Sequence, residues 1–127
     1  MQKINKKVLI VEDEPGSFMP LEAVFSDAGF DVVLAKDGQE GLDAVKKENP
    51  DLIILDILMP KINGIEMAKK LKELGISIPA IFLTQLKDEE HIADAMESYR
   101  SDSDYIIKTD ISLDEIVKRA KTKLGIE

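Results

Sequence analysis

Short apolar runs alternate with longer amphipathic stretches along the whole chain, and this alternation constrains the fold more than any other feature. Five runs are apolar enough to be strands buried on both faces, at Lys7–Val11, Asp31–Ala35, Leu52–Leu55, Ala80–Leu83 and Tyr105–Ile107. Each is followed by a stretch with helical periodicity, at Phe18–Ala28, Gln39–Glu48, Ile65–Leu74, Asp88–Tyr99 and Leu113–Leu124. The pattern predicts five β/α units, in which parallel strands are covered by helices on both faces.

The composition limits the size and the setting of the protein. Its 127 residues, of which 44% are hydrophobic, suffice for a single domain spanning 1–127 and are too few for two. The absence of cysteine excludes disulfides and thiolate metal sites, and it favours a reduced, cytoplasmic location. The apolar run after the basic N-terminus is too short for a signal peptide or a membrane span. The formal net charge of −8 would repel nucleic acid, so we expect this chain to bind neither nucleic acid nor membranes.

Polar side chains directly follow four of the five predicted strands. They are Glu12, Asp13, Asp56, Thr84 and Lys108. Because the carboxyl ends of parallel strands meet at one edge of an open sheet, where such sheets bind ligands, we expect these side chains to lie together. The second strand ends in Lys36-Asp37-Gly38 and offers nothing comparable, which fits an edge strand in the order 2-1-3-4-5.

Taken singly, each of these residues has an ordinary structural explanation. An acid after a strand is commonly a turn former or a helix cap, a threonine is common in strands, and a single lysine is commonly a surface residue. Asp56 is different because apolar residues precede and follow it directly. Burying an unpaired charge there is costly, so a functional role is the better interpretation of Asp56.

The combination of residues indicates phosphoryl transfer. Three carboxylates gathered at one edge would repel one another unless a cation is bound, and Mg²⁺ prefers oxygen ligands of this kind. Lys108 would supply a compact positive charge for an anionic oxygen, and the Thr84 hydroxyl would donate to another. The Asp56 carboxylate would be the nucleophile.

These residues, in this order, resemble the receiver family of two-component response regulators over essentially the whole chain. The resemblance rests on VLIVEDE at 8–14, DLIILDILMP at 51–60 with Asn63-Gly64, IFLT at 81–84 and DYIIK at 104–108. It implies a flavodoxin-like (βα)5 fold, a doubly wound five-stranded parallel sheet of order 2-1-3-4-5. It also implies a regulatory phosphoacceptor domain that is not an enzyme but assists its own phosphorylation and dephosphorylation.

The resemblance assigns a role to each acidic residue. Asp56 would accept the phosphoryl group from a phosphohistidine on a sensor histidine kinase or a histidine phosphotransfer protein. Asp13 would bind Mg²⁺ directly and Glu12 would hold metal-bound water. Asp56 and the backbone carbonyl of Leu58 would complete the protein ligands.

The resemblance also assigns the switch, with two departures from the family pattern. Thr84 and Lys108 would contact the phosphoryl group, and Tyr105 would be the aromatic side chain whose rotamer follows Thr84. A downstream protein would bind the altered face made by the fourth helix, fifth strand and fifth helix. Gln85 replaces a small residue and would restrict access to the phosphoryl group. Thr109 replaces the usual cis proline, so we expect a rearranged loop after the fifth strand.

Three other functions remain open at this stage. A phosphatase of the haloacid-dehalogenase type would have Asp-x-Asp after the first strand, where this chain has Glu12-Asp13-Glu14. A pseudo-receiver would work unphosphorylated, and against it stands the presence of Asp13, Asp56, Thr84 and Lys108. A flavin-binding protein would have a Ser/Thr/Gly phosphate loop after the first strand. The only histidine, His91, lies among acids and is expected to be a surface residue.

Overall fold

The computed structural model describes residues 4–57, 63–85, 89–100 and 103–126. One sheet contains the strands β1 (Lys7–Val11), β2 (Asp31–Ala35), β3 (Leu52–Leu55), β4 (Ala80–Thr84) and β5 (Asp104–Ile107). The helices are α1 (Pro15–Asp27), α2 (Gly38–Glu48), α3 (Gly64–Glu73), α4 (Glu89–Ser98) and α5 (Leu113–Lys123). A short 3-10 turn, Lys108–Asp110, connects β5 to α5.

All strand pairs in the sheet are parallel, in the order β2-β1-β3-β4-β5. This confirms the predicted doubly wound α/β fold and the edge position of β2. The pairing places Val11 beside Leu55, and Thr84 beside Ile107. The carboxyl ends of β1, β3, β4 and β5 therefore lie at the same edge of the sheet, which positions the residues that follow them.

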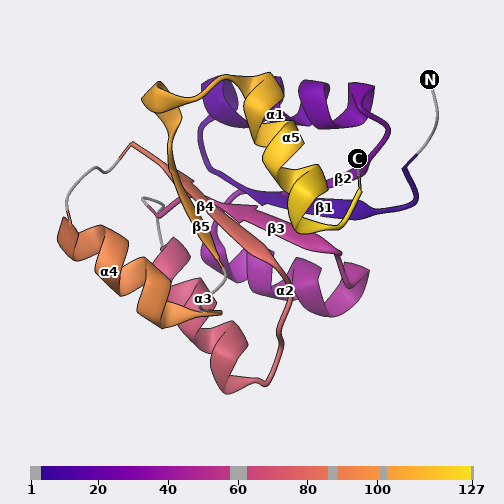
Figure 1. Cartoon of the computed structure of the whole chain (residues 1–127). Coiled ribbons are helices and arrows are strands. Elements are labelled where there is room, and N and C mark those ends of the chain that lie inside the picture. The colour runs from indigo at the N-terminus through magenta and orange to yellow at the C-terminus, as the bar shows by residue number, and fades with distance from the viewer. Residues whose placement is uncertain (1–3, 58–62, 86–88, 101–102, 127) are drawn as a thin grey trace.

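Helices cover both faces of the sheet, with α1 and α5 on one face and α2, α3 and α4 on the other (Figure 1). Alternate residues of each strand enter opposite cores, because successive side chains of a strand point to opposite faces. Val8 and Ile10 pack with Phe25 of α1, whereas Leu9 and Val11 pack with Met67 of α3. The central strands are almost entirely apolar for this reason, and each fully buried Val, Leu or Ile contributes about 1.5–3 kcal/mol.

The ends of helix α3 are set by a side-chain capping box at its start and by a glycine at its end. The Asn63 side chain accepts a hydrogen bond from the Glu66 backbone N–H at 2.9 Å, and the Glu66 carboxylate accepts one from the Asn63 backbone N–H at 3.4 Å. This capping box fixes the start of α3 immediately after the segment that follows Asp56. Gly75 ends the same helix with a φ of 73°, a conformation that a side chain would strain.

Some elements differ from the sequence-based expectations. Helix α1 begins at Pro15, three residues before the expected start, because proline suits the first helical position. As expected, the helix continues through Pro20. The 3-10 turn at Lys108–Asp110 was not predicted; its peptide bonds, like all others in the described segments, are trans. The expected start of the fourth helix at Asp88 lies outside the described residues.

No helix within the described segments is both long enough and apolar enough to cross a membrane.

Candidate functional site

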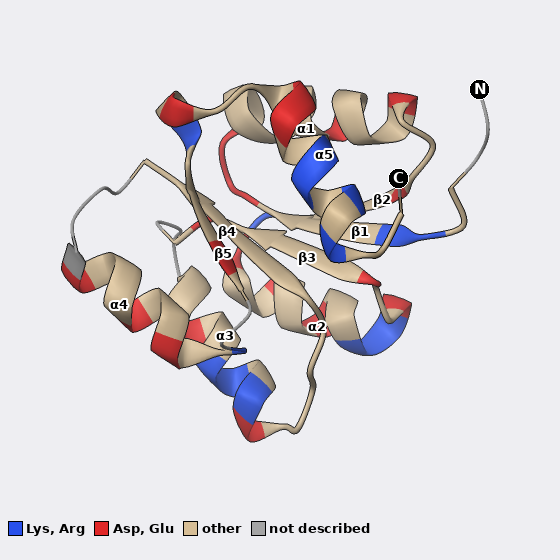
Figure 2. Ribbon diagram, in the orientation of Figure 1, with Lys and Arg blue, Asp and Glu red and all other residues tan. Residues whose placement is uncertain are grey.

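An acidic pocket lies at the carboxyl edge of the sheet. Glu12, Asp13 and Asp56 each place one carboxylate oxygen within 4.8 Å of the others. The Asp56 backbone N–H donates to the Val11 carbonyl at 3.0 Å, which fixes Asp56 beside the end of β1. The connection from β1 to α1 is strongly acidic (Figure 2). The sequence-based prediction that these three acids lie together is therefore confirmed.

Two of these carboxylates are buried. The exposed fraction is 3% for Glu12 and 7% for Asp56, whereas Asp13 is half-buried. The pocket has a volume of about 180 Å³. It is lined by Glu12, Asp13, Glu14, Asp56, Thr84, Gln85 and Lys108. Four separate strand ends thus supply one small polar cavity, large enough for an ion and a few water molecules.

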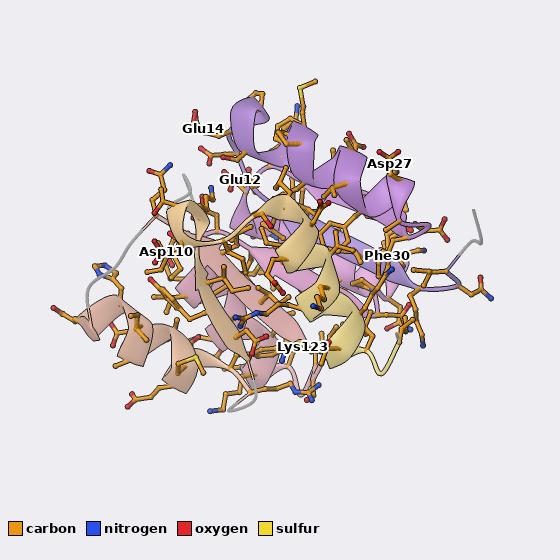
Figure 3. All side chains as sticks on the ribbon, turned by 45° about the horizontal axis from the view of Figure 1, so that its top comes forward. Glu12, Glu14, Asp27, Phe30, Asp110 and Lys123 are labelled. Carbon is orange, nitrogen blue, oxygen red and sulfur yellow. The ribbon has the colours of Figure 1, made fainter. Side chains whose placement is uncertain are left out.

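Lys108 joins the last strand to this pocket. Its Nζ lies 2.7 Å from Glu12 Oε2 and 3.3 Å from Asp56 Oδ2, and only 17% of its side chain is exposed. Figure 3 shows Glu12 and Glu14 on the same side of the molecule as Asp110, which follows Lys108 in the 3-10 turn. The predicted proximity of the lysine to the acids is confirmed, and the ion pairs balance part of the buried negative charge.

The electrostatics of the pocket favour a bound cation. The pKa of Glu12 is raised to about 7, chiefly by burial; the hydrogen bond from Lys108 lowers this pKa, and the negative charge of Asp56 raises it. Burial alone would lower the pKa of Lys108, but its hydrogen bond to Glu12 and the charges of Asp56 and Glu12 together raise it. Lys108 is therefore a fixed positive charge, and the acids retain an excess of negative charge that a metal ion would neutralise.

Thr84 and Tyr105 lie on neighbouring strands. Thr84 is fully buried at the end of β4, and Tyr105 is half-buried in β5. Because Phe82 pairs with Tyr105 and Thr84 with Ile107, the side chains of Thr84 and Tyr105 share one face of the sheet, two residues apart along the strands. Gln85 is exposed and lies at the pocket, where the sequence analysis expected it to limit access.

Gly64 packs directly against the backbone of Asp56. Its N–H donates to the Ile57 carbonyl at 3.1 Å. A Cβ at position 64 would lie 2.9 Å from the Asp56 carbonyl carbon and 3.1 Å from the Ile57 Cα, and it would clash with the Asp56 carbonyl oxygen. Only glycine permits this approach, so the first residue of α3 packs directly against the backbone of Asp56.

The sequence model of the response regulator receiver domain matches residues 8–121. The chain belongs to this family. This confirms the resemblance, and the protein is a receiver domain of two-component response regulators.

Known proteins similar to this receiver domain include both long and short relatives. It is 42% identical over 87 residues to the alkaline phosphatase synthesis transcriptional regulatory protein PhoP of Bacillus subtilis, a match covering 68% of this chain and 36% of PhoP. It is 36% identical over 94 residues to sporulation initiation phosphotransferase F of Bacillus subtilis, covering 74% of this chain and 76% of that protein. The chain spans between 36% and 44% of the length of several transcriptional regulators that it matches.

Comparison with solved structures also identifies a receiver fold. The receiver domain of the Francisella response regulator 1452 superposes with a TM-score of 0.86 at 30% identity, covering 95% of this receiver and 98% of that chain. The superposition therefore covers nearly the whole receiver fold.

Five of the predicted site residues line the pocket, namely Glu12, Asp13, Asp56, Thr84 and Lys108, whereas Tyr105 is not among its lining residues. Leu58, the predicted carbonyl ligand, lies outside the described residues. Two residues were missed by the sequence analysis. Glu14 lines the pocket, and Ser17 of α1 accepts a hydrogen bond from Lys108. Neither could be found from the sequence, because an acid and a serine at the start of a helix are common as capping residues.

Proposed function

We propose that this receiver is a phosphorylation-dependent switch in which Asp56 accepts a phosphoryl group from a sensor histidine kinase or a histidine phosphotransfer protein. The observation that carries the proposal is a buried aspartate at a polar pocket with a lysine Nζ 3.3 Å from its Oδ2. An Asp56 oxygen would form the new bond to phosphorus as the phosphorus–nitrogen bond of the phosphohistidine breaks. The imidazole then takes up a proton, and the product is an acyl phosphate on Asp56.

Mg²⁺ fits the donor set of the pocket. The three acids offer only oxygen ligands, which suits a hard cation that keeps several waters. Bound Mg²⁺ would neutralise charge on the carboxylates and on the incoming phosphoryl group. Glu12 Oε1 accepts from the Glu14 backbone N–H at 3.2 Å and Oε2 accepts from Lys108, so both of its oxygens are engaged by the protein. This supports Asp13 as a direct ligand and Glu12 as a holder of metal-bound water, with Asp56 and the Leu58 carbonyl as the other ligands.

Lys108 and Thr84 would hold the phosphoryl oxygens. Lys108 already donates to Asp56, and one of its N–H groups would pass to a phosphoryl oxygen as Asp56 loses its negative charge. The Thr84 hydroxyl would move toward another phosphoryl oxygen. Tyr105 shares the sheet face of Thr84, so this movement would open space for its ring and alter the surface made by α4, β5 and α5. A downstream protein would bind that surface.

The receiver would therefore act by changing its protein partners. It assists the gain and loss of its own phosphoryl group and turns over no external substrate. Its net charge of −8 argues against direct binding of nucleic acid by this chain, although PhoP and TrcR are named as transcriptional regulatory proteins.

The test is incubation with Mg²⁺ and acetyl phosphate, followed by intact-mass measurement and peptide mapping. We expect the mass of one phosphoryl group on Asp56, and none in Asp56→Asn. Asp51→Asn is the matched control, since Asp51 accepts the Lys7 backbone N–H at 2.8 Å at the opposite end of β3. Full labelling of folded Asp56→Asn would refute the assignment. A folded wild-type receiver that takes no label would favour a pseudo-receiver, and steady hydrolysis of an external phosphate ester would favour a phosphatase.

A further inference from the structure

Lys108 has a third partner that the proposed phosphoryl transfer does not use. Besides the oxygens of Glu12 and Asp56, its Nζ lies 3.2 Å from Ser17 Oγ. An ammonium group has three N–H donors, one for each of these oxygen atoms. The three acceptors come from different parts of the fold, after β1, after β3 and in the first turn of α1.

The two carboxylates change when the site is used. Asp56 becomes an acyl phosphate and loses its charge, and Glu12 would engage metal-bound water. Ser17 is neutral and takes part in neither event, so its contact with Lys108 can persist through the reaction. It is the one of these three acceptors that can define the position of the ammonium group before and after transfer.

Ser17 is placed well for this task. It is half-buried, and its backbone N–H donates to the Glu14 carbonyl at 2.9 Å. Ser17 and Lys108 both line a groove of about 270 Å³ between α1 and α5, and Lys108 also lines the acidic pocket. The ammonium group therefore lies where the two cavities meet, and the Ser17 hydroxyl holds it from the side of α1.

The lysine would otherwise be poorly restrained. Its four-carbon stem is flexible, and its third N–H would turn to water if Ser17 Oγ were absent. The short contact to Glu12 would then draw the ammonium group away from the phosphoryl oxygens. Small displacements of a charged group have large effects on a step that depends on positioning.

We propose that Ser17 is a positioning residue that holds the Lys108 ammonium group in place for phosphoryl transfer to Asp56. The inference rests on the proposed function, and Ser17 itself forms no bond to phosphorus. Loss of its hydroxyl should slow phosphorylation about fivefold, the effect of losing about 1 kcal/mol of hydrogen-bond stabilisation at the ammonium group.

The test compares Ser17→Thr with Ser17→Val in the full chain, because these side chains have the same shape and differ in the hydroxyl. We expect the Thr variant to match wild type and the Val variant to react with acetyl phosphate about fivefold more slowly at saturating Mg²⁺, with an unchanged Mg²⁺ half-saturation. Ser17→Ala, which favours the helix, provides a second variant without the hydroxyl. Ser26→Val is the control for a valine in an exposed position of α1.

A second readout needs no phosphorylation. With ¹⁵N-labelled lysine, the Lys108 ammonium signal should shift in the Val and Ala variants and stay in place in the Thr variant. If wild type is labelled on Asp56 and the Thr and Val variants react at equal rates, the inference is overturned while the proposed function stands. If folded wild type takes no label, both the proposed function and the inference about Ser17 are refuted.

Discussion

Gly64→Ala tests how closely Asp56 depends on the start of α3. The substitution adds one methyl group where the helix meets the backbone of Asp56 and Ile57. The atoms that it meets belong to the main chain and cannot rotate away. Either the first turn of α3 or the backbone that carries Asp56 must therefore move.

The size of the movement follows from the contact distances. Ordinary contacts begin at 3.4 Å and the added carbon would lie 2.9 Å from the Asp56 carbonyl carbon, so the shift is at least the difference of 0.5 Å. Overpacking of this kind costs about 1–3 kcal/mol. The lower entropy of alanine in the unfolded chain offsets about 0.4–1 kcal/mol. Since a misplacement of about 1 Å can slow a reaction about 100-fold, we expect about tenfold slower phosphorylation of Asp56.

The assay pairs urea unfolding with the rate of labelling by acetyl phosphate. Gly16→Ala is the matched control, because a Cβ at position 16 meets nothing within 4 Å. That control should be as stable as wild type or up to about 1 kcal/mol more stable. A Gly64→Ala protein with wild-type stability and a wild-type labelling rate would refute the reasoning, since it would mean that the backbone absorbs the methyl group without moving Asp56.

Three further predictions concern single substitutions. Asp13→Ala should weaken Mg²⁺ binding more than Glu12→Ala in an NMR titration, because both Glu12 oxygens already accept hydrogen bonds from the protein; the reverse order would exchange their roles. Gln85→Ala should speed the loss of the phosphoryl group at fixed Mg²⁺, since Gln85 lines the pocket and would hinder the attacking water; equal decay rates would show that its side chain points away. Ser103→Ala should leave the free energy of unfolding unchanged or raise it, because in the described part of the chain the buried Ser103 hydroxyl has no partner; a loss above about 1 kcal/mol would contradict this.

The sequence predicts the sheet well because its signal is local. β1, β2 and β3 have the predicted bounds, since each is a short run of mostly apolar residues that is followed directly by a charged residue. The strand order then brings Glu12, Asp56 and Lys108 to one edge without any knowledge of their contacts. Topology alone was enough to predict the pocket.

Contacts between distant segments could not be predicted in the same way. Ser17 and Lys108 are separated by 91 residues, and nothing in the helical pattern of α1 distinguishes Ser17 from an ordinary first-turn serine. The close approach of Gly64 to Asp56 also depends on the angle at which α3 meets the sheet. These details are set by packing, which a periodic pattern does not encode.

The ion pair between Glu12 and Lys108 spans 96 residues and joins the first strand to the last. A ribosome adds about 5–20 residues per second, so the lysine is made roughly 5–20 seconds after the glutamate. Throughout that interval the acids of β1 and β3 have no cationic partner from β5. A nascent receiver, or one truncated before β5, would therefore lack the lysine that we propose holds the phosphoryl group in the finished domain. Competence to receive a signal would arise only when synthesis of the domain is nearly complete, which protects the pathway from responding through unfinished chains.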